Sequence, residues 1–169
     1  MAVIEEFLGK RVEIPDALRY HTKQGFWVKP QNEDLVFGLT EPALILAGGI
    51  NDLDWLVAEG QDVSAGESIV FAITGKIWYI EAPTTGKISF NSAAKAKPSL
   101  ILEDPYCQGW LFKIKPEKKM DGQLMHFATS QEYLQSLQSS DGVKNPKGLK
   151  GGVSGICKAV YTGIRDQKI

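Results

Sequence analysis

The residue of this chain whose type and position best fit a covalent role is Lys76. It stands in the stretch 68–90, SIVFAITGKIWYIEAPTTGKISF, where two apolar runs rich in β-branched residues flank Thr74-Gly75-Lys76. This pattern predicts a β-hairpin with a lysine beside its tight turn. A long acyl group attached to that amine would swing between neighbouring proteins while the domain stays folded. The alternative is an ordinary solvated lysine after a two-residue Thr74-Gly75 turn.

The cysteines and histidines of the chain do not form a recognisable catalytic or metal-binding site. The two cysteines, Cys107 and Cys157, are far apart and fit no metal-binding or disulfide framework. No basic group adjoins Cys107 in the sequence, which favours an inert thiol over a redox role, whereas Lys158 adjoins Cys157. His21 and His126 have no companion at metal-ligand spacing and are predicted to be surface or hydrogen-bonded polar residues. The chain also lacks a Ser/His/Asp set and a phosphate-binding glycine loop, so it is not predicted to be an enzyme.

The composition is that of an ordinary globular protein. The 169 residues are 43% hydrophobic and 23% charged, with a formal net charge of −1. Near-neutrality argues against a surface devoted to nucleic acid or anionic membrane. No window is long and apolar enough to span a membrane, and the acidic N-terminal stretch with Glu5 and Glu6 does not resemble a signal peptide. A cytoplasmic protein with reduced thiols is expected.

The elements that would position Lys76 are short strands separated by Gly/Pro turns. Besides the hairpin, strands are predicted at 20–28, 35–39, 53–58, 87–91 and 110–115, with an Ala/Lys/Pro connector following Asn91. Thr40 is expected to cap a brief helix over 43–47 that ends at Gly48-Gly49. The stretch 122–137 has helical periodicity, with Ser130 as a cap for its second half. Residues 1–18 are interpreted as a lead-in with a short helix around Val3–Leu8. A small β-rich sandwich or barrel is predicted.

Several segments, in order along the chain, resemble the H protein of the glycine cleavage system. The resemblance runs from about Ile14 to Leu137. The segments that carry it are IPDALRY (14–20), FWV (26–28), FGLTE (37–41), VSAGE (63–67), APTTGKI (82–88), EDPY (103–106) and GWLFKIK (109–115). Glycines and prolines fall at the corners of the predicted sheets. Trp27, Phe71, Phe90, Trp110 and Phe112 are expected to supply core area by burial.

The resemblance implies a mainly β fold of the barrel-sandwich hybrid type, the fold of lipoyl and biotinyl carriers, with a short internal helix and a C-terminal helical segment. It implies a swinging-arm carrier of an aminomethyl or acyl group or electrons, with covalent lipoate on Lys76 and with Thr74 and Gly75 forming the hairpin tip. The implied partners are a pyridoxal-phosphate decarboxylase, an aminomethyltransferase, dihydrolipoyl dehydrogenase and a lipoate-attaching enzyme. No methionine flanks Lys76, which disfavours a biotin carrier. Lys87 also follows a turn glycine, but it matches an ordinary strand-start residue of the family.

The chain departs from the family pattern at the hairpin tip. Pro83 follows Lys76 by seven residues instead of eight, so aligning Lys76 with the modified lysine requires a one-residue deletion. Without that gap Gly75 takes the lysine's place, and Ile73 stands where the family has an acidic residue. Gly25-Phe26 likewise replaces a His-Glu pair before Trp27. A scaffold that keeps the fold but carries no lipoate is therefore the alternative function.

The expected organisation is a lead-in at 1–13, a carrier domain at 14–138 and a tail at 139–169. From Lys144 onward the tail has six basic residues and one acid. It is interpreted as a loosely packed basic tail. The alternative is a docking segment for a partner, with 156–164 as its apolar anchor.

Overall fold

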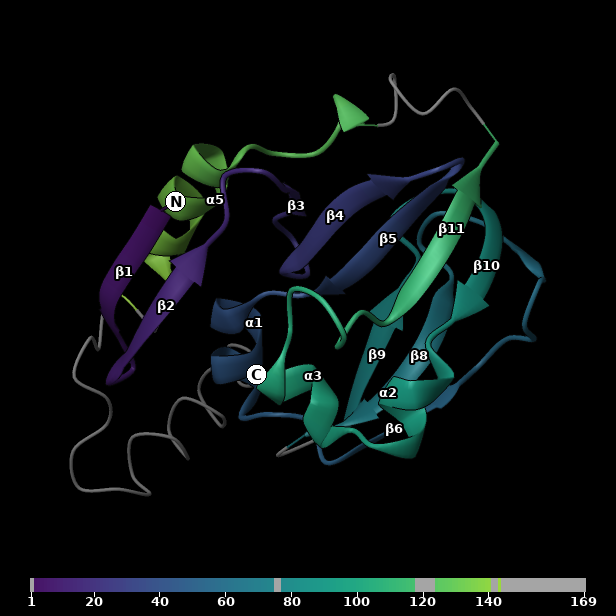
Figure 1. Cartoon of the computed structure of the whole chain (residues 1–169), viewed down its shortest axis with the longest axis horizontal. Helices are drawn as coiled ribbons and strands as arrows, with labels where there is room; N and C mark the ends of the chain where they lie inside the picture. Colours follow the sequence, from purple (N-terminus) through teal and green to yellow (C-terminus); the bar gives the residue numbers. More distant parts are fainter. Residues whose placement is uncertain (1, 75–76, 118–123, 141–142, 144–169) are drawn as a thin grey trace.

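Three antiparallel sheets form the framework of the described part of the chain (Figure 1). The computed structural model describes residues 2–74, 77–117, 124–140 and 143. The largest sheet has six strands in the order β3-β4-β5-β11-β10-β7, the second has three in the order β6-β8-β9, and the third is the hairpin β1-β2. The expectation of a mainly β chain is confirmed.

The N-terminal residues form a hairpin, not the predicted helix. Strand β1 (Ala2–Phe7) pairs with β2 (Lys10–Ile14), and the turn between them places Leu8 and Gly9 at positive φ. The expectation of a short helix around Val3–Leu8 is therefore wrong. An isolated helix of that length is marginal, whereas the hairpin gains ladder hydrogen bonds and buries Phe7 completely.

The six-stranded sheet contains two strands where the sequence predicted one at 20–28. Strand β3 (Arg19–His21) turns back into β4 (Phe26–Gln31), because Gly25 adopts a φ of +78° and its N–H donates to the His21 carbonyl. The remaining strands of this sheet are β5 (Asp34–Leu39), β7 (Asp62–Val63), β10 (Gly86–Phe90) and β11 (Phe112–Pro116). The predictions for 35–39, 87–91 and 110–115 are confirmed to within two residues.

The three-stranded sheet contains the hairpin singled out in the sequence. Strand β8 (Ser68–Ile73) lies between β6 (Asp52–Trp55) and β9 (Ile77–Glu81), so β9 is an edge strand. The strand predicted at 53–58 ends earlier, at Trp55. The inner face of this sheet joins the inner face of the larger sheet in one hydrophobic cluster, which includes Phe26, Phe37, Val70 and Ile80.

Aromatic residues fill the core in two clusters. Phe37 stacks on Phe112 with ring centroids 5.2 Å apart, and Phe26 meets Phe112 edge-on at 5.6 Å. The second cluster joins the N-terminal hairpin to Trp27 and Tyr133. Of the expected core aromatics, Trp27, Phe90 and Phe112 are buried, but Phe71 and Trp110 are only partly covered.

The helices are short and begin at capping residues. Thr40 caps α1 (Glu41–Ala47) and Gly48 ends it in the left-handed conformation, as predicted. The connector after Asn91 forms the helix α2 (Ser92–Ala96), and α3 (Ser99–Glu103) follows it.

The C-terminal helix α5 (Ser130–Ser136) continues into the 3-10 turn η1 (Leu137–Ser139). Its cap is Thr129 and not Ser130 as expected. Thr129 and Glu132 form a reciprocal capping box, and Ser130 instead donates to the Asp16 carboxylate at 2.6 Å.

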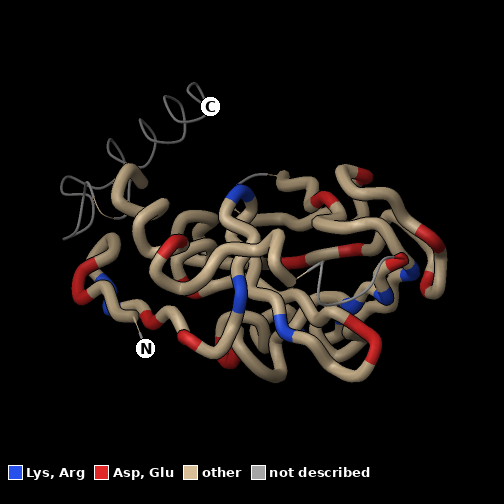
Figure 2. Tube along the Cα trace, turned by 90° about the horizontal axis from the view of Figure 1, so that it is seen from above, with Lys and Arg blue, Asp and Glu red and all other residues tan. Residues whose placement is uncertain are grey.

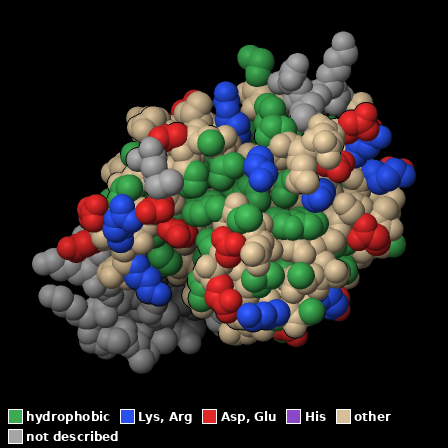
Figure 3. Space-filling view, in the orientation of Figure 1, with side chains coloured by type: hydrophobic (Ala, Val, Ile, Leu, Met, Phe, Trp, Pro, Cys, Tyr) green, Lys and Arg blue, Asp and Glu red, His purple; other side chains and the backbone are tan. Residues whose placement is uncertain are grey.

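The surface mixes charges of both signs. Figure 2 shows acidic and basic residues interspersed along the described trace, in keeping with the near-zero net charge. On the face seen in Figure 3, hydrophobic side chains gather towards the middle and charged side chains lie around them. No described helix is both long and apolar enough to cross a membrane.

A close contact between β4 and β5 allows the packing of the cluster around Trp27 and Tyr133 to be tested by mutation. Trp27 lies directly opposite Gly38, and a Cβ at position 38 would come within 2.5 Å of the Trp27 ring. We expect Gly38→Ala to lower the free energy of unfolding by about 1–3 kcal/mol, because the ring has to shift in a packed core. Guanidinium unfolding followed by circular dichroism measures the loss. Ser89→Ala, at a half-buried strand position, is the control, and equal stabilities of the two variants would contradict the prediction.

Candidate functional site

The β8-β9 hairpin is present, and its register defines the candidate tip. Ile73 pairs with Ile77, so Thr74, Gly75 and Lys76 stand between the last paired residues. The turn therefore contains three residues, whereas one interpretation of the sequence is a turn of two residues, Thr74 and Gly75. Gly75 and Lys76 lie outside the described residues, so the position of the Lys76 amine stays a prediction.

Thr74 is held in place at the end of β8. Its side chain is buried, at 6% exposure, and its carbonyl accepts a hydrogen bond from the Asn51 side chain at 3.4 Å. The backbone N–H of Asn51 also donates to the Ile73 carbonyl at 2.8 Å. The loop after α1 therefore fixes the strand up to the residue before the tip.

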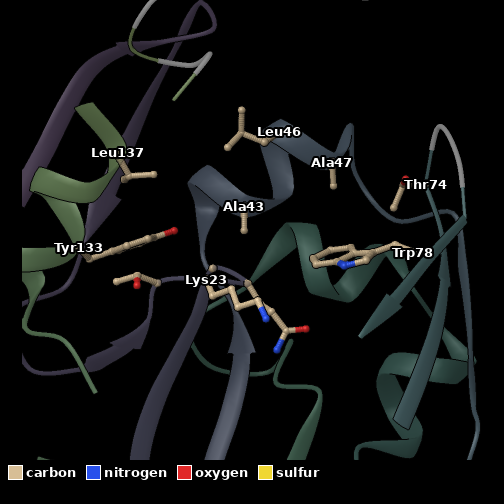
Figure 4. A pocket seen from close by; sticks show the side chains of 11 residues that line it. Lys23, Ala43, Leu46, Ala47, Thr74, Trp78, Tyr133 and Leu137 are labelled. Atoms are coloured by element: carbon tan, nitrogen blue, oxygen red, sulfur yellow. The ribbon is translucent and has the colours of Figure 1, made fainter. Parts of the chain in front are cut away.

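A cavity of about 360 Å³ opens beside the tip (Figure 4). Thr74 and Trp78 stand on one side of it, Tyr133 and Leu137 on the other, and α1 lines it through Ala43, Leu46 and Ala47. The turn at 22–25 completes the wall. Three segments far apart in the sequence, namely the β3-β4 turn, the hairpin and the C-terminal helix, thus meet at one recess.

Gln24 joins the 22–25 turn to the edge of the smaller sheet. Its amide nitrogen donates to the Glu81 carbonyl at 3.0 Å, and its amide oxygen accepts from the Glu81 N–H at 2.9 Å. A side chain that bonds both backbone groups of an edge-strand residue acts like one more pair of the ladder. This contact fixes the distance between strand β9 and the 22–25 turn, which both line the cavity.

The opposite wall is fixed by a pair of buried hydroxyls. Tyr133 and Thr40 are hydrogen-bonded at 2.6 Å, while the Thr40 oxygen also accepts from the Ala43 N–H. Burial raises the pKa of Tyr133 to about 12, so its phenol stays protonated. Its ring stacks on Tyr20 with centroids 4.8 Å apart.

The described residues give this recess a mainly apolar lining. Lys23 is the one charged side chain among the described residues that line it. No group of His, Cys, Asp and Glu in the described part of the chain could hold a metal ion. The walls are mainly aliphatic and aromatic, which suits a long, largely apolar group attached at the adjacent tip.

A second cavity, of about 470 Å³, lies near the turn at 83–85 and is lined by His21, His126 and Glu117. The His21 imidazole is half-buried, and its Nδ1 atom has no hydrogen-bond partner among the described residues. Burial lowers the pKa of His21 below its usual 6.5. The expectation of a surface or satisfied residue fits the exposed His126 but not His21.

The other candidate residues are not brought to the hairpin site. Cys107 is a free, exposed thiol in the loop before β11, while Cys157 lies outside the described residues. Lys87 is exposed on β10 opposite Lys115, within the larger sheet.

Sequence reasoning did not find the recess, although one signal was present. The Gly25-Phe26 departure marks the turn that lines it. A Cβ at Gly25 would approach the Ala43 Cβ to 2.5 Å, so glycine is needed there for close packing as well as for its positive φ.

The fold and the site together define a small β-rich domain: two facing sheets with a tight hairpin, whose residue Thr74 lines an apolar recess. The model of the family described as "Glycine cleavage H-protein" matches residues 18–139, and the chain belongs to that family. Members of this family are lipoate carrier proteins.

Curated and solved relatives agree with this assignment. The chain is 30% identical to the glycine cleavage system H protein of Thermus thermophilus, over 70% of this chain and 94% of the relative. It is 32% identical to the H protein of Salmonella arizonae, over 72% and 95%. The crystal structure of a glycine cleavage system H protein from Mycobacterium marinum superposes with a TM-score of 0.60 at 28% identity, over 72% of this chain and 97% of that one. The predicted barrel-sandwich hybrid fold is confirmed.

Removing the Gln24 contact is expected to loosen the hairpin's edge. In Gln24→Ala both hydrogen bonds to Glu81 are lost, which should cost about 1–2 kcal/mol and speed exchange of the Glu81 amide. Hydrogen exchange followed by nuclear magnetic resonance measures the rate. Lys23→Ala, in the same turn, is the matched control. An unchanged Glu81 rate in Gln24→Ala would show that the contact does not hold the edge.

The lowered pKa of His21 predicts a pH-dependent stability. The folded state resists protonation of this imidazole, so the unfolded state binds more protons below about pH 6.5. We expect the free energy of unfolding to be fully retained above that pH and to fall as the pH drops through the unfolded pKa towards the folded one. His21→Gln should flatten this part of the profile measured by urea unfolding, with His126→Gln as the control. A profile that keeps its slope in His21→Gln would assign the effect to other groups.

Proposed function

We propose that this protein is a lipoyl swinging-arm carrier and that Lys76 is its modified residue. The observation that carries the proposal is the recess beside Thr74, next to a hairpin turn that contains Lys76 in a family of lipoate carriers. An aliphatic arm attached at the turn can rest its distal part against Trp78 and Leu46 without unfolding any element. Shelter of this kind shields a reactive group from water between partners.

Attachment requires one amide bond. The neutral amine of Lys76 attacks an activated lipoyl ester supplied by a lipoate-attaching enzyme, the activating group leaves with the bonding electron pair, and the amine loses a proton. When bound, the dithiolane would supply a disulfide that accepts two electrons from the group's donor, with its S–S bond breaking to leave either two thiols or one thiol and one sulfur that carries the transferred group. The chain's own residues then serve to hold the arm: the Gln24-Glu81 contact and the Thr40-Tyr133 pair keep the two walls of the recess in position.

The proposed partners are those of glycine cleavage: a pyridoxal-phosphate decarboxylase, an aminomethyltransferase and dihydrolipoyl dehydrogenase. The support is the family assignment and the relatives named glycine cleavage system H protein. The cytoplasmic location expected from the sequence is part of the same proposal.

A lipoate-free scaffold is the second candidate, and one observation favours it. Ile73 and Ile77, which flank the tip, are 39% and 59% exposed, so the hairpin presents apolar side chains where a modifying enzyme would approach. An exposed apolar surface of this kind fits a protein that binds a partner as well as it fits a lipoate carrier.

Mass spectrometry decides between the two candidates. The protein is produced together with a lipoate-attaching enzyme, and its intact mass and peptide map are compared with those of Lys76→Arg and Lys87→Arg. We expect a lipoyl adduct in the wild type and in Lys87→Arg but not in Lys76→Arg, because Lys76 follows Thr74, which lines the recess, by two residues, whereas Lys87 lies within the larger sheet. A wild type that stays unmodified while a standard H protein in the same cells is fully lipoylated would reject the carrier role.

A further inference from the structure

The face of the three-stranded sheet that points away from the core is apolar. Side chains alternate along β8 and β9, so Val70, Ala72 and Ile80 are buried while Phe71, Ile73, Ile77 and Tyr79 face outward. Ile77 and Tyr79 are 59% and 55% exposed. We call these four outward residues the hairpin patch.

The register makes the hairpin patch continuous. Ile73 lies opposite Ile77, and Phe71 lies opposite Tyr79 with ring centroids 5.5 Å apart and planes at 68°. The solvent-facing side of an antiparallel sheet is normally polar. An edge strand such as β9 that exposes apolar side chains also invites association. The patch is therefore expected to be covered in the working protein.

The neighbouring positions on the same face are acidic. Asp52 lies opposite Ile73 and Asp54 opposite Phe71, while Glu81 follows Tyr79 by two residues on β9. A hydrogen bond from Lys95, 2.8 Å away, lowers the pKa of Asp54 and keeps it ionised. A ligand for this face should combine apolar side chains with positive charge.

We propose that the chain's own C-terminal segment, residues 144–169, binds the hairpin patch. The segment has six basic residues and one acid, and its apolar residues include Val153, Ile156, Val160 and Ile164. It lies beyond the family match, which ends at residue 139, and the Thermus and Mycobacterium relatives are covered over 94% and 97% of their own length by about 70% of this chain. The segment is thus an addition to the carrier domain, and its charge complements the acidic border of the patch.

The chain is long enough to reach the hairpin from where its described part ends. Leu137 lines the same cavity as Thr74, the last described residue of the hairpin's first arm. Val143, six residues after Leu137, packs against the cluster that contains Tyr133. The ten residues from Val143 to Val153 can span up to about 35 Å. A segment of that length can pass a cavity of about 360 Å³ and continue along the hairpin.

Binding in this position has a consequence that rests on the proposed function. The patch flanks the turn that contains Lys76, so a bound segment would limit the access of a lipoate-attaching enzyme or a partner enzyme to one side of the hairpin. The docking itself needs no lipoate, so the two proposals fail independently.

Paramagnetic labelling of the full-length chain tests the docking, because Cys157 lies within the segment. In Cys107→Ser protein made without lipoate, a nitroxide on Cys157 should strongly attenuate the amide signals of β8 and β9. Replacing both Ile77 and Tyr79 with Ser should restore those signals. Met125→Ser, at an 81%-exposed position outside this sheet, is the matched control and should leave the attenuation in place. Lowering the positive charge of the segment, from six basic residues and one acid to four basic residues and three acids in Lys158→Glu with Arg165→Glu, should weaken the attenuation without changing a residue of the folded domain.

Three results would overturn the proposal: no attenuation on β8 and β9, attenuation unaffected by the double serine variant, or attenuation only between molecules. The last is detected by mixing isotope-labelled, spin-free protein with unlabelled, spin-labelled protein, and it would assign the patch to the segment of a second copy.

Discussion

The site depends on a steric constraint at Gly25. Its positive φ lets β3 turn back into β4 within four residues, and its lack of a side chain lets the turn lie against Ala43 of α1. Its carbonyl accepts from the Thr40 N–H at 3.0 Å, so the turn also fixes the residue that caps α1. Any larger residue would separate the turn from the helix, because the Cβ would overlap that of Ala43.

Two contacts extend this constraint to both walls of the recess. From the residue before Gly25, Gln24 reaches the edge of the smaller sheet at Glu81. Thr40, whose N–H bonds to the Gly25 carbonyl, is hydrogen-bonded through its side chain to Tyr133 of the C-terminal helix. The hairpin and the C-terminal helix are thereby placed relative to one turn, although they are distant in the sequence. A preformed recess of this kind needs rigid walls, because ordering them on binding would cost conformational entropy.

The sequence predicted local features well and long-range contacts poorly. The Thr40 cap, the Gly48 stop and the β8-β9 hairpin depend on residues close together in the chain, and short-range rules identify them. The Gln24-Glu81 contact joins residues 57 apart, and no local pattern signals it. The N-terminal residues favour a helix by local pattern and form a hairpin instead, because their burial comes from a distant partner, the cluster around Tyr133. At α5 the sequence offers two adjacent capping residues, Thr129 and Ser130, and the structure uses Thr129 because Ser130 is hydrogen-bonded to Asp16.

Strand β9 is more apolar than the core of the domain requires. Its residues Ile77 to Ile80 are all apolar, a pattern typical of a strand covered on both faces. The described residues bury only the face with Trp78 and Ile80, and the other face is open. A strand that had only to close this core would alternate with polar residues and gain solubility. The apolar outer face therefore indicates a second contact, and the acidic residues beside it favour a basic ligand.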